Sequence, residues 1–286
     1  MKILNTALHC RKEVEALKKK GKTVGLVPTM GSLHQGHLSL VEAAKKKCHT
    51  VFMTIFVNPT QFGPGEDFER YPRDLDRDAA LAEKKGVDFL FCPEVGELYR
   101  EGYSTYVEVE GITDVMCGRY RPGHFRGVAT VVLKLFNIIP AHRAFFGEKD
   151  YQQLVVIKRM AADLDIDIEI TGCPTVREED GLALSSRNRY LDPRQRENAV
   201  EIYRALKKAG EAILGGEEDL KKISRQAIEI LEKNPYIKKV DYFDIRDPGS
   251  LMELDRPGRG GQVLIAAAAW IGETRLIDNV VISKKK

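Results

Sequence analysis

The chain has 286 residues, of which 43% are hydrophobic, so it can bury a sizeable core in one large or two modest domains. Its net charge of +3 is small for a dedicated nucleic-acid binder, in which excess Lys and Arg are concentrated. No apolar run reaches the roughly 18 residues of a membrane span, and the first residues carry no signal-peptide pattern. The five cysteines are scattered, without a C-x-x-C pair, which fits neither a disulfide framework nor a zinc site. We therefore expect a cytoplasmic protein that binds neither nucleic acid nor membranes.

Apolar runs alternate with helical patterns over the first part of the chain. This rhythm predicts a Rossmann-like, doubly wound parallel sheet with helices on both faces. Ligands bind at the carboxyl ends of the strands in such sheets. The strands are expected over 23–28, 50–57, 87–92, 143–146 and 166–170, and the helices over 37–48, 75–85, 128–139 and 151–163.

The pattern changes after about residue 176. Two helices, expected over 193–214 and 217–232, are followed by strands over 239–245 and from 262 onward. This order is typical of an α+β unit, so we expect a catalytic domain over 1–176 and a smaller cap domain over 177–286. The lysines at 284–286 are expected to be a frayed end.

Two histidines, His34 and His37, lie in the loop that leaves the first strong apolar strand. A strand, a glycine-containing turn and a helix N-terminus together form a phosphate site, because free N–H groups and the positive end of the helix dipole face outward there. Gly36 lets the backbone approach a ligand closely. The loop therefore predicts chemistry on a phosphoryl chain. Two exposed loop histidines are the simpler alternative, and a zinc site is disfavoured by the i, i+3 spacing.

Three further clusters follow strands or begin the cap domain. Asn58 and Gln61 carry amides that suit a small polar substrate, although the same residues also form ordinary turns. Gly147, Lys149, Asp150 and Gln153 combine close backbone approach, a cation for phosphate and an acceptor for a ribose hydroxyl. The loop Leu184-Ser185-Ser186-Arg187 is either an anion clamp or a polar linker into the next helix.

Five motifs in this order resemble the pantoate–β-alanine ligase family, which belongs to the nucleotidylyltransferase superfamily. The resemblance covers nearly the whole chain and is strongest from Val24 to Leu191. One departure is Leu184, where the family commonly has Met. The motifs are PTMGSLHQGH (28–37), FVNPTQF (56–62), RPGHFRGV (121–128), FGEKDYQQ (146–153) and LSSRNRYL (184–191).

The resemblance implies a ligase that makes pantothenate, a coenzyme A precursor, in two steps. Pantoate and ATP give pantoyl adenylate and pyrophosphate; β-alanine then displaces AMP. His37 matches the family's proton donor, and His34, His37 and Lys149 are the expected catalytic residues. The expected ATP-binding residues are Met30, Gly31, His34, His37, Gly147, Lys149, Asp150, Val176, Leu184, Ser185, Ser186 and Arg187. The expected substrate-binding residues are Phe56, Asn58, Gln61, Val128, Val131, Val132 and Gln153.

The resemblance also implies Mg²⁺ on the phosphates and a homodimer formed through the N-terminal domain. The family's acidic position matches Asp78, with Asp76 as its neighbour; the alternative is an ordinary exposed helix face. The segment Ser104–Glu110 is the candidate edge strand of the dimer. Because an acyl adenylate hydrolyses readily, the Gly63-Pro64-Gly65 loop and the cap domain are expected to close over it.

Three rival functions remain. Another enzyme of the superfamily would share the histidine loop but lack the Asn58–Gln61 and Gly147–Asp150 motifs. A catalytically silent nucleotide sensor would have lost His34, His37 or Lys149, all of which are present. An RNA-binding module would carry a basic, aromatic tail, which this chain lacks.

Overall fold

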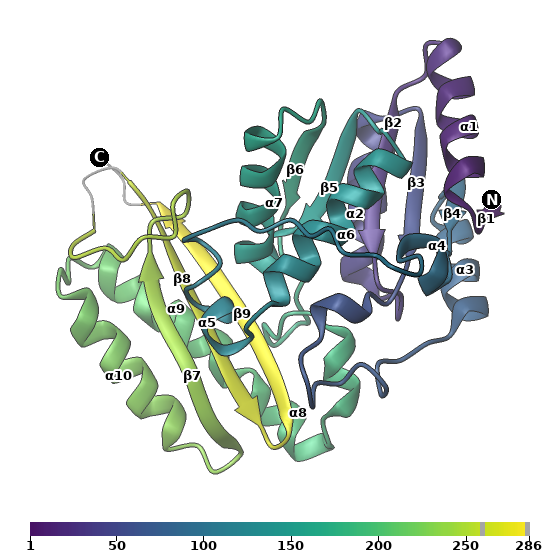
Figure 1. Ribbon diagram of the computed structural model, residues 1–286. Helices are drawn as coiled ribbons and strands as arrows, with labels where there is room; N and C mark the ends of the chain where they lie inside the picture. Colours follow the sequence, from purple (N-terminus) through teal and green to yellow (C-terminus); the bar gives the residue numbers. More distant parts are fainter. Residues whose placement is uncertain (258–260, 284–286) are drawn as a thin grey trace. The chain divides into compact units, whose positions relative to one another are not determined.

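A computed structural model describes residues 1–257 and 261–283 (Figure 1). The chain forms two compact units. The N-terminal unit comprises Met1–Thr113, Arg121–Glu148 and Gln153–Pro174. The C-terminal unit comprises Asp114–Tyr120, Lys149–Gln152 and the residues from Thr175 onward. The lysines at 284–286, expected to be frayed, lie outside the described residues.

The N-terminal unit contains a six-stranded sheet in the order β1-β4-β3-β2-β5-β6, in which every neighbouring pair is parallel. The strands run β1 Lys2–Leu4, β2 Val24–Thr29, β3 Thr50–Ile55, β4 Phe89–Phe91, β5 Arg143–Gly147 and β6 Glu169–Cys173. The chain winds outward from β2 in one direction through β3 and β4, and in the other through β5 and β6. The topological switch point therefore lies between β2 and β5, where ligands bind in open sheets of this kind.

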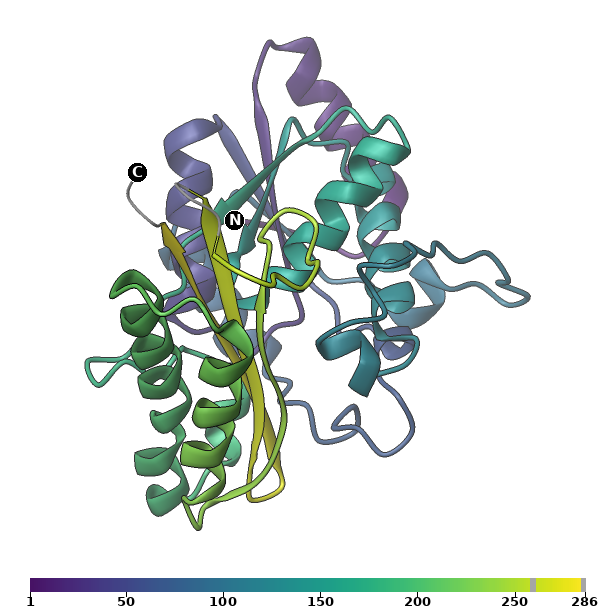
Figure 2. The same cartoon turned by 90° about the vertical axis from the view of Figure 1, so that its left-hand side faces the viewer.

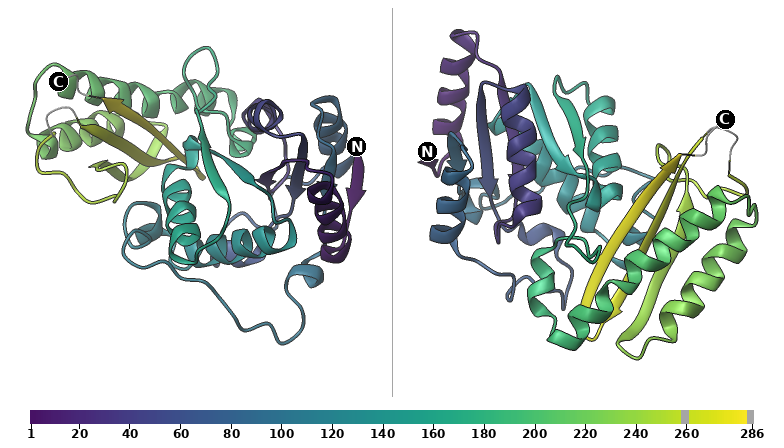
Figure 3. Two further views of the ribbon diagram at one scale, coloured as in Figure 1. Left: turned by 90° about the horizontal axis from the view of Figure 1, so that it is seen from above. Right: turned by 180° about the vertical axis from the view of Figure 1, so that it is seen from behind.

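Helices cover both faces of this sheet, as the view from above shows (Figure 3). They are α1 Ala7–Lys19, α2 Gln35–Lys47, α3 Leu75–Lys84, α4 Val95–Leu98, α6 His124–Ile138 and α7 Tyr151–Asp163. Val27 and Met53 pack with α2 and α3 in one core cluster. Leu26 and Phe52, which alternate with them along the strands, are fully buried on the other face. Burial on both faces explains why these strands read as continuous apolar runs.

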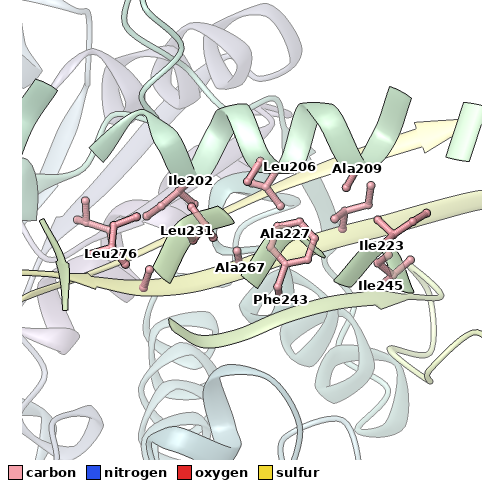
Figure 4. Packing of buried hydrophobic residues seen from close by; sticks show 14 of the residues in the cluster. Ile202, Leu206, Ala209, Ile223, Ala227, Leu231, Phe243, Ile245, Ala267 and Leu276 are labelled. Atoms are coloured by element: carbon pink, nitrogen blue, oxygen red, sulfur yellow. The ribbon is translucent and has the colours of Figure 1, made fainter. Parts of the chain in front are cut away.

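The C-terminal unit pairs a three-stranded antiparallel sheet with two long helices. Its elements are α5 Cys117–Tyr120, α8 Pro193–Ala199, α9 Glu201–Leu214, α10 Leu220–Glu232, β7 Ile237–Arg246, β8 Gln262–Ile271 and β9 Thr274–Ser283. Figure 2 shows α9 and α10 side by side along one face of this sheet. Leu206 of α9 and Leu231 of α10 pack with Phe243 and Ala267 of the strands in one core (Figure 4). The expected fold class, a doubly wound parallel sheet followed by a smaller α+β unit, is confirmed.

Three expected elements differ from the structure. Residues 193–214 form two helices rather than one, since α8 ends at Ala199 and α9 begins at Glu201. The strand expected over 166–170 begins at Glu169, because Asp165 adopts a left-handed φ of 49° and Ile166 N–H folds back to the Ala161 carbonyl. The segment Ser104–Glu110 joins no strand among the described residues; Val107 N–H instead donates to Thr130 Oγ1 of α6.

All five cysteines are free thiols. Burial raises the pKa of Cys10 to about 12 and that of Cys92 to about 11. Burial also raises the pKa of Cys48 and of Cys173. These four thiols belong to the N-terminal unit. Among the described residues, no helix is long and apolar enough to cross a membrane.

Candidate functional site

The loop after β2 turns sharply, and a buried carboxylate accepts hydrogen bonds from its backbone. Gly31 and Ser32 both adopt left-handed backbone, with φ of 83° and 51°. Asp78 of α3, 1% exposed, accepts hydrogen bonds from Ser32 N–H at 2.6 Å and Leu33 N–H at 2.9 Å. A Cβ on Gly31 would lie 3.0 Å from Asp78 Oδ2, so glycine gives the carboxylate room to reach the loop. Arg77 completes the contact by pairing with Asp78 and donating to the Leu33 carbonyl.

His34 and His37 form the N-terminal cap of α2. His34 Nδ1 accepts from Gly36 N–H at 3.1 Å, and His37 Nδ1 accepts from His34 N–H at 3.3 Å, a reciprocal capping box made by two imidazoles. The ring centroids lie 4.1 Å apart. Because each Nδ1 accepts a backbone N–H, each neutral ring carries its proton on Nε2. The helix N-terminus thus presents two Nε2–H donors, as an anion site requires.

The amides expected to bind substrate are buried and joined to each other. They belong to the short helix η1 (Pro59–Gln61) and its N-cap, which follow β3. Asn58 Nδ2 donates to Gln61 Oε1 at 3.1 Å and to the Gly127 carbonyl at 3.1 Å. Gln61 Nε2 lies 3.1 Å from Met30 Sδ, so the loops after β2 and β3 meet at this amide.

Helix α6 lies against η1 with almost no space between the two backbones. A Cβ on Gly127 would fall 2.2 Å from the Thr60 carbonyl oxygen, so only glycine permits this approach. The predicted apolar substrate-binding residues are all buried here: Phe56 after β3, and Val128, Val131 and Val132 on α6. The approach places the first turn of α6 next to Gln61.

An ion pair also holds the loop that follows η1. Arg121 donates to both carboxylate oxygens of Glu66, at 2.7 and 2.6 Å, and to the Gln61 carbonyl at 3.2 Å. His124 Nδ1 lies 2.8 Å from the same carbonyl. Burial pushes the pKa of Glu66 upward, but the hydrogen bonds and charge of Arg121 outweigh it, and the pKa lies below its usual value. The loop at Gly63–Gly65 is therefore anchored at both ends.

The remaining predicted residues of the N-terminal unit lie at or after the end of β5. Gly147 is its last residue, and a Cβ there would have no atom within 4 Å. The open space over this glycine is what a site for close ligand approach requires. Gln153 lies half-buried in the first turn of α7.

The C-terminal unit holds the predicted lysine and the serine loop. Lys149, Ser185 and Asp278 line one small pocket. Lys149 pairs with Asp150 at 3.5 Å, and Asn279 Nδ2 of β9 donates to the Lys149 carbonyl at 2.8 Å. Strand β9 thus fixes the backbone of the predicted phosphate-binding lysine.

A buried ion pair includes Asp278, one of the residues that line this pocket. Arg177 binds Asp278 through both guanidinium ends, at 2.6 and 2.9 Å, and stacks on Tyr203 at 4.0 Å. Burial raises the pKa of Asp278, while Arg177 opposes that shift.

The serine loop contains a capped turn. Ser185 Oγ accepts from Arg187 N–H at 3.3 Å and caps the short helix η3 (Ser186–Tyr190). Leu184 N–H donates to the Val176 carbonyl at 3.0 Å, so these two predicted ATP contacts are adjacent. The Val176 carbonyl and the Leu184 N–H are therefore paired with each other within the protein.

The donor set around Asp78 does not fit a protein-bound Mg²⁺ ion. Both carboxylate oxygens accept backbone N–H groups, and Arg77 lies 3.3 Å from Oδ1. The described residues contain no cluster of three His, Cys, Asp or Glu side chains that could hold a metal. The alternative interpretation of Asp78, an ordinary exposed helix face, is also wrong, because the side chain is buried. Its neighbour Asp76 is exposed.

Several residues that support the site carried no signal of their own in the sequence. Tyr99 donates to Asn58, and Asn279 donates to the Lys149 carbonyl. Glu66 accepts from Arg121, which in turn donates to the Gln61 carbonyl. All of these hydrogen bonds join residues that lie tens of positions apart in the sequence. Arg121 and His124 lie in one of the five motifs, but the motif gave them no role. Such partners become visible only in the folded structure, because periodicity and spacing carry no information on distant contacts.

A family model described as pantoate-beta-alanine ligase matches residues 2–281 of the chain. The chain belongs to the pantoate–β-alanine ligase family. It is 53% identical over 284 residues to the pantothenate synthetase of Pelotomaculum thermopropionicum, covering 99% of this chain and 100% of that one. It is 54% identical over 282 residues to that of Moorella thermoacetica, covering 99% of both.

Solved structures agree with this membership. The pantothenate synthetase from Thermus thermophilus superposes with a TM-score of 0.91 at 48% identity, covering 98% of this chain and 99% of that one. The pantoate–β-alanine ligase from Francisella tularensis, complexed with βγ-ATP and β-alanine, gives a TM-score of 0.80 at 34% identity and covers 98% and 97%. The chain is thus a pantoate–β-alanine ligase, and it uses ATP to join pantoate to β-alanine.

Proposed function

We propose that the ligation runs through pantoyl adenylate. A carboxylate oxygen of pantoate attacks the α-phosphorus of ATP, and the bond to the β-phosphate oxygen breaks to release pyrophosphate. The β-alanine amine then attacks the acyl carbon, the bond to the AMP oxygen breaks, and the amine loses a proton. The observation that carries this proposal is the pair of Nε2–H donors that His34 and His37 present at the N-terminus of α2.

The two imidazoles have the properties that the first step needs. Negative charge builds on the leaving pyrophosphate as the phosphorus–oxygen bond breaks, and fixed N–H donors stabilise such charge without having to reorganise. The helix dipole adds to this effect. We assign the transfer of a proton to the leaving group to His37 and additional charge stabilisation to His34.

The other predicted residues take the roles that their chemistry supports. Lys149 and Arg187 contribute cations for the phosphates, and the hydroxyls of Ser185 and Ser186 donate to phosphate oxygens. Met30, Gly31 and Gly147 let the nucleotide approach the backbone, Asp150 accepts from the ribose, and Val176 and Leu184 contact the base through backbone groups. Gln61, Gln153 and Asn58 hold pantoate and β-alanine, with Phe56, Val128, Val131 and Val132 around the methyl groups.

We expect Mg²⁺ to arrive with ATP and to be held by phosphate oxygens and water, as is usual in nucleotide sites. Asp78 remains the acidic residue that the family resemblance points to, but its hydrogen bonds favour a structural role. No step above depends on a metal held by the protein.

We further propose a homodimer formed through the N-terminal unit and located in the cytoplasm, where ATP is available. The segment Ser104–Glu110 supports the dimer, because backbone that lies in no helix or strand of its own unit offers groups for pairing with another chain. Tyr106 in this segment is 40% exposed and lies under Arg126 at 4.0 Å. Analytical ultracentrifugation of the wild type and of Tyr106→Glu tests this: a dimer that dissociates in the variant is expected, and a wild-type monomer contradicts it.

The two-step reaction can be tested with isotopically labelled pantoate. With ¹⁸O in the pantoate carboxylate, one label should appear in the phosphate of AMP, since that oxygen bridges the acyl group and the phosphorus. Pyrophosphate should be released from ATP and pantoate alone, and AMP should turn over only after β-alanine is added. Label in inorganic phosphate or pyrophosphate would instead indicate activation at another phosphorus. Mixtures without pantoate are the control.

A further inference from the structure

Tyr99, which follows α4, forms hydrogen bonds with the N-cap and the first turn of η1, where the amides proposed to bind substrate lie. Its hydroxyl donates to Asn58 Oδ1 at 2.8 Å, the shortest hydrogen bond that this oxygen receives among the described residues. The Thr60 hydroxyl lies 3.0 Å from the same oxygen and 3.2 Å from Tyr99 Oη. Tyr99 is therefore part of a closed hydrogen-bonded group with Asn58 and Thr60.

The Tyr99 ring is itself held in one position. The Tyr103 ring packs against it edge-on with centroids 5.0 Å apart, and Lys134 Nζ lies 5.6 Å from its centroid. Burial raises the pKa of Tyr99 to about 12, so the hydroxyl remains a donor at any working pH. A fixed ring and a permanent proton make the hydroxyl a rigid anchor for Asn58.

The contacts of Asn58 determine which way its amide points. Its Oδ1 faces three donors, the Tyr99 hydroxyl and the N–H and hydroxyl of Thr60, and its Nδ2 faces two acceptors, Gln61 Oε1 and the Gly127 carbonyl. An amide with O and N exchanged would set donors against the Thr60 N–H and an acceptor against the Gly127 carbonyl. Asn58 therefore presents an N–H to Gln61.

The orientation of Asn58 in turn determines that of Gln61. Since Gln61 Oε1 is occupied by Asn58 Nδ2, its Nε2 points away, toward Met30 Sδ. Sulfur is a weak acceptor, and Nε2 carries two hydrogens. Gln61 thus offers N–H donors, and it selects an oxygen acceptor on the ligand rather than a hydrogen-bond donor.

We propose that Tyr99 is a positioning residue for pantoate: through Asn58 it holds Gln61 with its N–H groups facing an oxygen of the substrate. The inference deepens the proposed role of Gln61 and rests on it. Tyr99 itself does not contact the substrate. Its contribution is to keep two buried amides from shifting when pantoate enters and leaves.

The test is the variant Tyr99→Phe, which keeps the ring and removes the hydroxyl. Tyr103→Phe is the matched control, because its ring belongs to the same aromatic group and its hydroxyl is not part of the hydrogen bonds to Asn58. AMP release is measured with pantoate varied at saturating ATP and β-alanine, and then with ATP varied. For Tyr99→Phe we expect a three- to tenfold higher KM for pantoate, with the KM for ATP and the melting temperature close to wild type. Tyr103→Phe should match the wild type in all three.

Two results would overturn the inference. An unchanged KM for pantoate in Tyr99→Phe would show that Asn58 and Gln61 stay in place without the hydroxyl. Equal increases in both KM values, together with a lower melting temperature, would show that Tyr99 only stabilises the unit. The proposed role of Gln61 is checked separately with Gln61→Glu, which replaces the donor by an acceptor. If that variant keeps the wild-type KM for pantoate, the assignment of Gln61 fails whatever Tyr99 does.

Discussion

Asp78 holds Ser32 by a 2.6 Å hydrogen bond from the Ser32 N–H to its carboxylate. Ser32 is in left-handed backbone, which is unfavourable for a residue other than glycine. The buried carboxylate offsets that strain, because hydrogen bonds to a charged acceptor are roughly twice as strong as neutral ones. The position of His34, two residues further on, therefore depends on a residue of α3 that lies 46 positions after Ser32.

Replacing Asp78 by Asn should weaken this support, since an amide has one acceptor oxygen where the carboxylate has two. We expect the free energy of unfolding to fall by about 1–3 kcal/mol. We also expect kcat to fall, because the loop that carries His34 loses its fixed shape. Urea unfolding and AMP release measure the two effects.

The same variant separates the structural role of Asp78 from metal binding. If Asp78 only supports the loop, the Mg²⁺ concentration for half-maximal activity should be the same in the variant and the wild type. A large increase in that concentration would instead identify Asp78 as a metal ligand. Asp76→Asn, an exposed change in the same helical turn, is the control and should leave both quantities unchanged.

The variant His34→Asn should separate capping from catalysis. Asparagine is among the best N-cap residues, and its side-chain oxygen can accept the Gly36 N–H that His34 Nδ1 accepts now. Stability should therefore stay within about 0.5 kcal/mol of wild type, whereas kcat should fall by roughly 10²–10³, the usual cost of losing one fixed donor. Near-normal turnover in this variant would show that the Nε2–H of His34 is not needed.

Gly147→Ala should impair nucleotide binding without affecting the fold. The added methyl has no atom within 4 Å, so stability should not fall. If the ribose lies against this backbone, the KM for ATP should rise about tenfold, equivalent to about 1.4 kcal/mol, with the KM for pantoate unchanged. Gly96→Ala is the control, because a Cβ there also has open space. An unaltered KM for ATP would remove Gly147 from the site.

The Glu66–Arg121 pair should give the protein part of its acid sensitivity. Because the folded-state pKa of Glu66 lies below its usual value, its contribution to stability is present above the unfolded-state pKa and is lost as pH falls through the folded one. Glu66→Gln should therefore be less stable than wild type by about 1 kcal/mol at pH 7, and the difference should shrink below about pH 4. Urea unfolding at both pH values measures it. Glu69→Gln, an exposed change in the same segment, should show no such trend.

The parallel sheet could be predicted because its strands are buried on both faces and follow one another at regular intervals. The histidine loop could also be predicted, because the end of an apolar strand, a glycine and a helix start lie within 15 residues, from Val27 to Val41. These features depend on local sequence, so local patterns reveal them.

The features that were missed depend on distant contacts. Asp78 reads as an ordinary helix residue until α3 is packed against the loop after β2. Ser104–Glu110 has the alternation of a strand, but its Val107 N–H is used by Thr130. Ala199 and Ile202 are both buried at helical spacing, so the apolar pattern runs through the break between α8 and α9 at Val200 without marking it. Sequence periodicity contains none of these contacts.

The alkylation rate of a buried cysteine can report how often the protein opens. A thiol reacts with an alkylating reagent only as the thiolate, and pKa values of about 12 for Cys10 and about 11 for Cys92 leave almost none of it at neutral pH. Cys10 is fully buried, whereas Cys92 is only half-buried, so alkylation of Cys10 must wait until the helices and strands around it separate. The rate at which iodoacetamide modifies Cys10 therefore follows the opening of the N-terminal unit, without an introduced label, and shows whether bound substrates slow it.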